Sequence, residues 1–182
     1  AFHCSVEKWF NPMQLSPNMS QQEIENLRMG FDLILDIDAK YKLEHAAVAA
    51  DILCSQLKNF GIKASIKFSG SRGFHIGVTG DAFPESVDFK KINKFYPQLP
   101  QTISEFLSEK IKDKLLEELI AREGGVASLV KIASSISELS PYEFVSIEKN
   151  WGNRHLFRMP YSLHTKTWLA SIPLKREILH KF

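Results

Sequence analysis

The segment Leu33–Ala39, with the sequence LILDIDA, most constrains what this chain can fold into. Successive side chains of a β-strand point to opposite faces, so the odd-numbered apolar residues share one face. Asp36 and Asp38 share the other face. The pattern therefore predicts a strand that contributes one face to the hydrophobic core and presents two adjacent carboxylates on its opposite face.

The acidic pair needs a partner, because like charges so close together repel each other. A divalent cation between them would relieve that repulsion, and carboxylate oxygens suit Mg²⁺ or Mn²⁺. Two such ions, about 4 Å apart, can polarise the attacking and leaving oxygens of phosphoryl transfer. An Asp-x-Asp pattern alone leaves a second interpretation open, in which the pair ends the strand at a solvated edge and Asp38 helps to start the next helix.

The loop Ser69–Gly73, SGSRG, joins two expected strands, residues 62–68 and 75–78. Its glycines allow a tight turn and a close approach to a ligand, and such turns expose backbone N–H groups that bind anions. Arg72 adds a planar donor fork that matches phosphate oxygens, and His75 opens the next strand. The loop predicts a triphosphate cradle that lacks the Gly-Lys-Ser/Thr of a P-loop. Alone, it also fits a plain hairpin with an exposed arginine.

A third cluster lies near the end of the chain, where Arg158, His164 and Lys166 surround a turn at Met159–Tyr161. Taken singly, Arg158 suits a strand edge and His164 suits an ordinary surface position. Taken with the acidic pair and the glycine loop, the cluster supplies phosphate donors opposite metal ligands. The three segments together indicate a nucleotidyl-transfer site.

The remaining pattern indicates an α+β fold in a single domain over residues 1–182, because the strands come in hairpin-like pairs and do not alternate strictly with helices. A serine cap with Glu23, and a Thr102 cap with Glu105, predict two helix starts. We expect helices over 21–29, 42–60, 102–123 and 126–139, strands over 31–39, 62–68, 75–78 and 144–148, strand-like pieces over 154–174, and an irregular connection over 81–101. The buried stripe of the third helix is predicted to include Phe106, and that of the second helix to include Phe60.

Composition limits the class of protein. The chain has 182 residues, is 44% hydrophobic and carries a net charge of +2, which suits one domain with a core of its own. It has neither an apolar run long enough for a membrane span nor a charged and apolar leader, so we expect a soluble intracellular protein without a membrane partner. Cys4 and Cys54 are too few for a four-cysteine zinc site, and Cys54 is expected in the core. The start at Ala1 suggests a trimmed chain.

The three motifs LDID, SGSRGFH and RMPYSLHTKT, in this order, resemble the catalytic small subunit of archaeal and eukaryotic DNA primases, in the archaeo-eukaryotic primase superfamily. The resemblance covers most of the chain. It implies a small α/β layer packed on a mostly antiparallel sheet similar to an RNA-recognition motif. It also implies a site in which Asp36 and Asp38 hold two divalent ions, Mg²⁺ or Mn²⁺. The nucleoside triphosphate would be bound by Ser69, Gly70, Ser71, Arg72, His75, Arg158, His164 and Lys166.

The sequence departs from the family pattern in two places. Where the family has a third aspartate, strict spacing places Ser146, and Glu148 two residues later could replace it as the third catalytic and metal-binding carboxylate. The cysteine and histidine zinc module of the family is not expected in this chain, because it has too few cysteines.

The resemblance implies a primase or primase-polymerase that joins nucleotides into RNA or DNA primers on single-stranded DNA and works with a large subunit. The expected location is cytoplasmic and nucleoid-associated in an archaeon, or nuclear in a eukaryote. Two alternatives stay open: a gap-filling repair polymerase of the same superfamily, and a nucleotide-binding or nucleic-acid-binding subunit that has lost catalysis. The choice between ribonucleotides and deoxyribonucleotides is also open.

Overall fold

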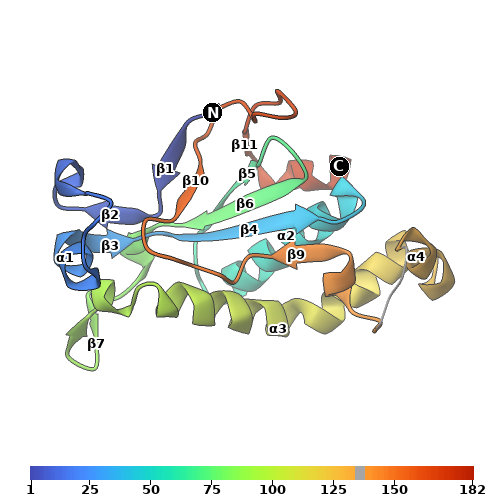
Figure 1. Ribbon diagram of the computed structural model, residues 1–182. Coiled ribbons are helices and arrows are strands. Elements are labelled where there is room, and N and C mark those ends of the chain that lie inside the picture. The colour runs from blue at the N-terminus through green and yellow to red at the C-terminus, as the bar shows by residue number, and fades with distance from the viewer. Residues whose placement is uncertain (134–137) are drawn as a thin grey trace.

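A five-stranded antiparallel sheet forms the centre of the protein, and its strand order is β11-β5-β6-β4-β9 (Figure 1). The computed structural model describes residues 1–133 and 138–182. The sheet consists of β4 (Leu33–Ala39), β5 (Ser65–Phe68), β6 (Gly73–Val78), β9 (Val145–Ile147) and β11 (Pro173–Leu174). The expected α+β fold is confirmed, with every strand pair of this sheet antiparallel.

The central strand β4 has the two faces that its sequence predicts. Leu35 and Ile37 are fully buried, whereas Asp36 and Asp38 are partly exposed on the other face. The pairing places Asp36 opposite His75 of β6, and Asp38 opposite both Gly73 of β6 and Ser146 of β9. The acidic face of β4 therefore continues onto the two neighbouring strands.

Two long helices cover the apolar face of the sheet: α2 (Leu43–Asn59) and α3 (Gln98–Arg122). The helix α2 packs on β4 and β6 through buried residues such as Ala46, Ala50 and Leu53, and α3 packs on α2 through Ile111 and Leu115. Alanines let the helix axis approach the sheet closely. Cys54 is half-buried against this core, where burial raises its pKa to about 11.

The first part of the chain builds a smaller layer beside the sheet (Figure 1). There β1 (His3–Ser5) pairs with β10 (Leu156–Arg158), and β2 (Glu7–Trp9) pairs with β3 (Arg28–Phe31). The short helix α1 (Gln21–Leu27) carries the predicted capping box between Ser20 and Glu23. This layer therefore joins the first residues of the chain to Leu156–Arg158, which come from its last third.

Shorter elements complete the chain. They are the pair β7 (Ser86–Val87) and β8 (Lys90–Lys91), the helix α4 (Val126–Ile132), and 3₁₀ helices at Pro12–Gln14, Gly80–Ala82, Ile92–Phe95, Pro141–Glu143 and Arg176–Lys181. Within the part of the chain that the structure describes, no helix combines the length and the apolar character that crossing a bilayer requires.

The predicted start of the third helix is wrong. Helix α3 begins at Gln98 after Pro97, so Thr102 lies inside it and forms no cap. Pro100 suggested a loop, but it lies in the first turn, where backbone N–H groups have no intrahelical acceptor for proline to remove. Residues 81–101 also hold β7 and β8, so they are less irregular than expected.

Two aromatic residues predicted in the core are exposed instead. Phe106 of α3 is 48% exposed and Phe60, after α2, is 46% exposed. Their ring centroids lie 6.1 Å apart, so each ring covers the other at the surface. Helical spacing identified the correct side of each helix but not the point where the core ends.

Several boundaries also differ from the sequence prediction. The helix expected over 21–29 ends at Leu27 and continues as β3, so the strand expected over 31–39 divides at Asp32. The strand expected over 62–68 begins at Ser65, and His75 lies inside β6 rather than at its start. The helix expected over 126–139 ends at Ile132, and residues 134–137 of that prediction lie outside the described residues.

Candidate active site

A cleft of about 550 Å³ lies at one end of the sheet, on the acidic face of β4. The loop Ser69–Gly73 and the segment His164–Thr167 form its other sides. Most of the predicted site residues line this one cleft: Asp36, Asp38, Ser69, Ser71, Arg72, His75, Arg158, His164 and Lys166. Three segments that are far apart in the sequence therefore converge, whereas Gly70 and Glu148 do not line the cleft.

Asp36 is the most strongly perturbed carboxylate of the cleft. Its Oδ1 atom is buried without a hydrogen-bond partner and lies 3.4 Å from Nε2 of His75. Burial raises the pKa of Asp36 to about 7, and the negative charges of Asp38 and Glu148 add to the effect. Without a cation, this site thus penalises the ionised form of its own carboxylate.

His75 lies across the strand pair from Asp36, and its side chain is only 7% exposed. Burial lowers its pKa to about 3, and the cationic side chains of Lys67 and Arg158 add to this shift. The ring is therefore neutral at physiological pH. A neutral imidazole keeps one N–H donor and one acceptor, so it can bind a ligand oxygen without adding charge.

Gly73 allows β6 to reach Asp38 at the rim of the cleft. A Cβ atom built on Gly73 would lie 1.7 Å from the backbone oxygen of Ile37, so any side chain there would force β6 away from β4. From the neighbouring position, Arg72 extends towards Asp38, with 3.5 Å between Nη2 and Oδ2. The arginine side chain is 67% exposed, so it is available to a ligand that enters the cleft.

Gly70 has a structural role beside the cleft. It adopts a positive φ of 90°, and a Cβ atom there would lie 3.0 Å from the backbone oxygen of Leu169. The hydroxyl of Thr167 donates to the Gly70 carbonyl at 2.5 Å, and Nη1 of Arg158 donates to the Ser69 carbonyl at 2.8 Å. These contacts fix the loop against the hairpin that carries His164.

His164 is oriented by its own chain. Its Nδ1 atom accepts hydrogen bonds from the backbone N–H groups of Lys166 at 3.1 Å and Thr167 at 3.2 Å. The neutral ring therefore carries its proton on Nε2 and can donate it to an anion. Desolvation lowers the pKa of His164, and the cations Arg158 and Lys166 lower it further.

Glu148 lies next to the cleft rather than in it. Its backbone N–H donates to the carbonyl of Asp36 at 2.9 Å, and its carboxylate lies 3.4 Å from Nε2 of His155. This partner raises the pKa of His155. Ser146 is exposed opposite Asp38, and its hydroxyl donates to the Asp38 carbonyl at 3.4 Å. The charge of Glu148 thus raises the pKa of Asp36, while its carboxylate contacts His155.

Asp36 and Asp38 fit a divalent cation, since Asp36 Oδ1 is a buried oxygen without a donor and the two charges repel each other. Among the residues described, no three histidine, cysteine or acidic side chains gather closely enough to hold a metal. Mg²⁺ sites that handle nucleotides often use one or two carboxylates and complete the coordination with substrate phosphates and water. The pair is therefore suited to a cation that arrives with a phosphate ligand.

Sequence reasoning missed three polar residues of this region. Thr165 and Thr167 line the cleft, and Lys67 lies beside His75 on β5. Lys67 is 7% exposed, and its Nζ donates to the hydroxyl of Ser171 at 2.8 Å. Burial lowers the pKa of Lys67 to about 8. The alternation along β5 could have identified this lysine, because Lys67 and Ser69 share a face.

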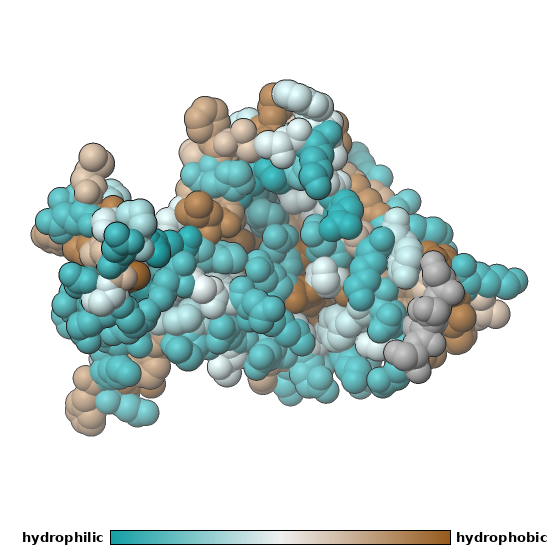
Figure 2. Space-filling model, in the orientation of Figure 1, coloured by the Kyte–Doolittle hydropathy of each residue, from teal (hydrophilic) through white to brown (hydrophobic). Residues whose placement is uncertain are grey.

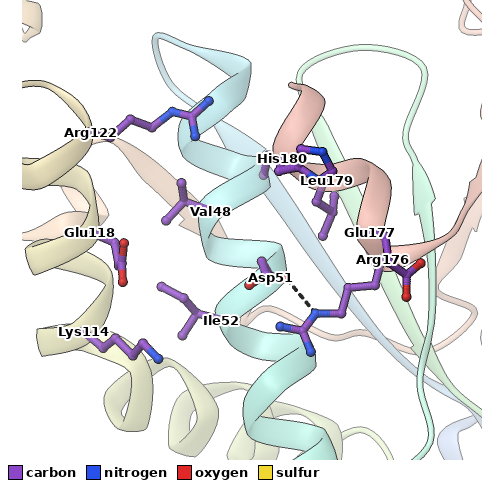
Figure 3. A pocket seen from close by; sticks show the side chains of 11 residues that line it. Val48, Asp51, Ile52, Lys114, Glu118, Arg122, Arg176, Glu177, Leu179 and His180 are labelled. Atoms are coloured by element: carbon purple, nitrogen blue, oxygen red, sulfur yellow. Dashed lines mark hydrogen bonds and ion pairs between the residues drawn. The ribbon is translucent and has the colours of Figure 1, made fainter.

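A separate cavity of about 470 Å³ lies between α2, α3 and the last 3₁₀ helix (Figure 3). Its charged side chains have both signs, and Nε of Arg176 donates to Asp51 at 2.6 Å. Arg122 donates to the backbone oxygen of Phe182 at 2.6 Å. These interactions fix the end of the chain onto the two helices, and none of the predicted site residues lines this cavity.

The fold is that of a nucleic-acid polymerase domain. The structure resembles the polymerase domain of Mycobacterium tuberculosis Ligase D, determined in complex with DNA, with a TM-score of 0.55 and 15% sequence identity. The match covers 98% of this chain and 53% of the Ligase D chain. At this identity the likeness concerns the fold alone.

The sequence assigns the family more closely. Residues 35–176 match the sequence profile of the DNA primase small subunit, and the chain belongs to that family. It is also 33% identical over 95 residues to an uncharacterized protein of Methanocaldococcus jannaschii, a match that covers 52% of this chain. The chain spans 20% of the length of that relative. A primase-type nucleotidyltransferase is thus the class of enzyme that family and fold support.

Proposed function

We propose that this chain is the catalytic domain of a primase or primase-polymerase, which joins nucleotides into a primer on a single-stranded DNA template. In this reaction a 3′-hydroxyl attacks the α-phosphate of a nucleoside triphosphate and pyrophosphate leaves. The observation that carries the proposal is the convergence of the acidic pair and the phosphate donors on one cleft. Membership of the primase small subunit family supports the same chemistry.

The side chains of the cleft divide into two sets with different tasks. Arg72, His164 and Lys166 supply donors to the triphosphate from the loop and the hairpin, because arginine and histidine N–H groups match phosphate oxygens. Arg158 holds the Ser69 carbonyl, so its first task is to keep the loop in place. Asp36 and Asp38 form the second set, on β4, and Asp38 lies next to Arg72, with 3.5 Å between Oδ2 and Nη2.

We propose that Asp36 and Asp38 hold the divalent ions, Mg²⁺ or Mn²⁺, that accompany the nucleotide. When bound, such ions neutralise the charge that develops on the phosphate and leaving oxygens. His75 contacts Asp36 and so keeps that carboxylate oriented towards the cleft. Glu148, directly after β9, raises the pKa of Asp36 through its negative charge.

The experiment is a primer-synthesis assay with purified protein, single-stranded DNA, nucleoside triphosphates, and Mg²⁺ or Mn²⁺. The wild type should make template-dependent products. Asp38→Asn should reduce the rate at least a hundredfold, since it removes a carboxylate while keeping shape. Asp113→Asn, on α3 and away from the cleft, is the matched control and should keep full activity. Equal activity of Asp38→Asn and wild type would refute the proposal.

The position of Glu148 favours one alternative, a nucleotide-binding subunit without catalysis. The cleft as described is lined by two carboxylates, and the third predicted one is directed to His155. This alternative expects nucleotide binding with no product in either metal. The same assay, run beside a binding titration, therefore separates the two functions.

A further inference from the structure

The hairpin of residues 159–172 carries His164 to the cleft and also exposes two large aromatic rings to solvent. It projects from one end of the molecule, beside the N-terminus and β11 (Figure 1). Figure 2 shows apolar and hydrophilic side chains next to each other at this end. Tyr161 is 75% exposed and Trp168 is 73% exposed. Tyrosine and tryptophan rings are enriched at interaction surfaces, so these two rings call for a ligand.

Both aromatic residues occupy backbone positions that favour glycine. Tyr161 has a φ of 65°, in a turn where the Ser162 N–H donates to the Met159 carbonyl at 3.2 Å. Trp168 has a φ of 61°, and its N–H donates to the His164 carbonyl at 2.9 Å. Bulky residues rarely adopt this left-handed region, and such strain gathers at functional sites. Because neither ring is buried, packing in the core does not offset the strain.

The two rings lie towards opposite ends of the hairpin. A β-bridge between Leu163 and Ala170 joins its two arms. Tyr161 comes before this bridge, whereas Trp168 lies in the closing turn beyond it. Thr167, next to Trp168, lines the cleft. An extended chain laid along the hairpin would therefore meet both rings and pass the mouth of the cleft.

The segment that contains the hairpin has charges of one sign only. The whole chain has 23 basic and 21 acidic residues, yet residues 149–176 contain neither Asp nor Glu. The basic residues of this segment are Lys149, Arg154, Arg158, Lys166, Lys175 and Arg176. Cations attract the phosphate backbone of a nucleic acid, and aromatic rings stack on its unpaired bases. An apolar pocket of a partner protein would match the rings but not this charge.

We propose that this hairpin binds single-stranded nucleic acid, with the rings of Trp168 and Tyr161 stacked on its bases. The inference rests on the proposed function, because it takes the bound strand to be the template. His164 and Lys166 stay with the triphosphate in the cleft, so the two ligands use different side chains of one hairpin. A duplex would not fit as well, because its bases are already stacked on one another.

The test measures the binding of a labelled oligothymidylate to the full chain by fluorescence anisotropy, at one salt concentration because such binding depends on salt. Trp168→Ala should weaken binding about tenfold, as is usual when one stacking ring is removed. Its affinity for inorganic tripolyphosphate, measured by calorimetric titration in Mg²⁺, should change less than twofold. Tyr161→Ala should weaken oligothymidylate binding in the same way and keeps the test valid if Trp168→Ala does not fold.

Phe89→Ala is the matched control. Phe89 is a fully exposed aromatic residue with a φ of 61°, in the turn between β7 and β8, and it does not line the cleft. The variant therefore removes an exposed ring from a similar backbone position outside the proposed surface. It should bind oligothymidylate as the wild type does.

Two further measurements separate stacking from a structural role of Trp168. Trp9 is half-buried and Trp151 is buried, so oligothymidylate should quench mainly the fluorescence of Trp168, whereas tripolyphosphate should not. Trp168→Gly relieves the positive φ, so in urea unfolding it should be at least as stable as the wild type. It should nevertheless bind oligothymidylate as weakly as Trp168→Ala, and Trp168→Phe, which keeps a ring, should restore most of the affinity.

Unchanged oligothymidylate affinity of the folded Trp168→Ala and Tyr161→Ala variants, or an equal loss in Phe89→Ala, would overturn the inference. The rings would then face a partner protein or solvent, and the proposed function would stand. A wild type that binds no single-stranded DNA would contradict the proposed function, and the hairpin surface with it.

Discussion

Asp36 and His75 face each other across β4 and β6, with 3.4 Å between Oδ1 and Nε2, where the acidic face of the sheet meets the glycine loop. The carboxylate has a raised pKa and the imidazole a lowered one, so each is held closer to its neutral form. Groups with strongly perturbed pKa values that meet in a cleft are a frequent mark of functional sites. The pair lies on regular strands, and this fixes its position.

The contact between Arg158 and the glycine loop predicts a binding defect. Arg158→Lys keeps the charge but loses the guanidinium that donates to the Ser69 carbonyl at 2.8 Å. Hydrogen bonds to charged groups contribute about 1.5–3 kcal/mol, and 1.4 kcal/mol is about tenfold in affinity. We expect tripolyphosphate to bind about tenfold more weakly in a calorimetric titration.

Arg122→Lys is the control for this change, because Arg122 also donates from a guanidinium to a backbone carbonyl, that of Phe182, outside the cleft. It should bind tripolyphosphate as the wild type does. If the two variants lose affinity for tripolyphosphate equally, the contact between Arg158 and the Ser69 carbonyl does not support phosphate binding.

A side chain at Gly73 should lower the stability of the protein, and Gly30 provides the matched control. Gly73→Ala places a methyl group 1.7 Å from the Ile37 oxygen, so β6 must move away from β4. Overpacking of this kind typically destabilises by about 1–3 kcal/mol. Gly30→Ala adds the same methyl group to a strand with open space and should leave stability unchanged or slightly higher. Urea unfolding measures both, and similar values for the two variants would contradict the packing described for Gly73.

A buried ion pair predicts the largest loss of stability. Arg28 and Glu7 have fully buried side chains, 2.8 Å apart, and join β3 to β2. Arg28→Met leaves the Glu7 carboxylate buried and unpaired, which typically costs about 3–5 kcal/mol. Adding Glu7→Gln to that variant should recover part of the loss. A double variant that is no more stable than Arg28→Met in urea unfolding would refute this coupling.

The lowered pKa of Glu123 should make the stability of the protein depend on pH. Hydrogen bonds from Lys42 at 2.7 Å and His45 at 2.9 Å lower the pKa of Glu123 below its usual value near 4.5. Because the folded pKa is lowered, the stabilisation is present above the unfolded value and is lost as pH falls through the folded one. Glu123→Gln should flatten the dependence of unfolding free energy on pH below about 4.5. A mutant curve parallel to that of the wild type down to pH 3 would contradict this contribution.

Much of the fold could be predicted because the relevant signals are local. The alternation in residues 33–39 defined both faces of β4, and the helical spacing from Leu43 onward identified α2. The start of α3 was missed because proline is tolerated in a first turn as well as in a loop. Phe60 and Phe106 were misplaced because spacing gives the side of a helix but not where its neighbour ends.

The cleft residues could be predicted from three motifs, but their relation to one another depends on long-range pairing. Nothing local in the sequence places Gly70 against Leu169 or Arg158 against Ser69, which are contacts between distant segments. The same holds for Gly73, whose importance follows from the Ile37 oxygen that faces it on β4. Glu148 shows the limit most clearly, because its partner His155 was not part of any motif.

The central claim is that the acidic strand, the glycine loop and the late hairpin bind one triphosphate. The most direct measurement is a crystal structure with Mn²⁺ and a non-hydrolysable nucleoside triphosphate. We predict phosphate oxygens within hydrogen-bond distance of Arg72 and His164, and Mn²⁺ on Asp36 and Asp38. A triphosphate bound elsewhere, for example in the cavity between α2 and α3, with the cleft holding neither ligand, would contradict the claim.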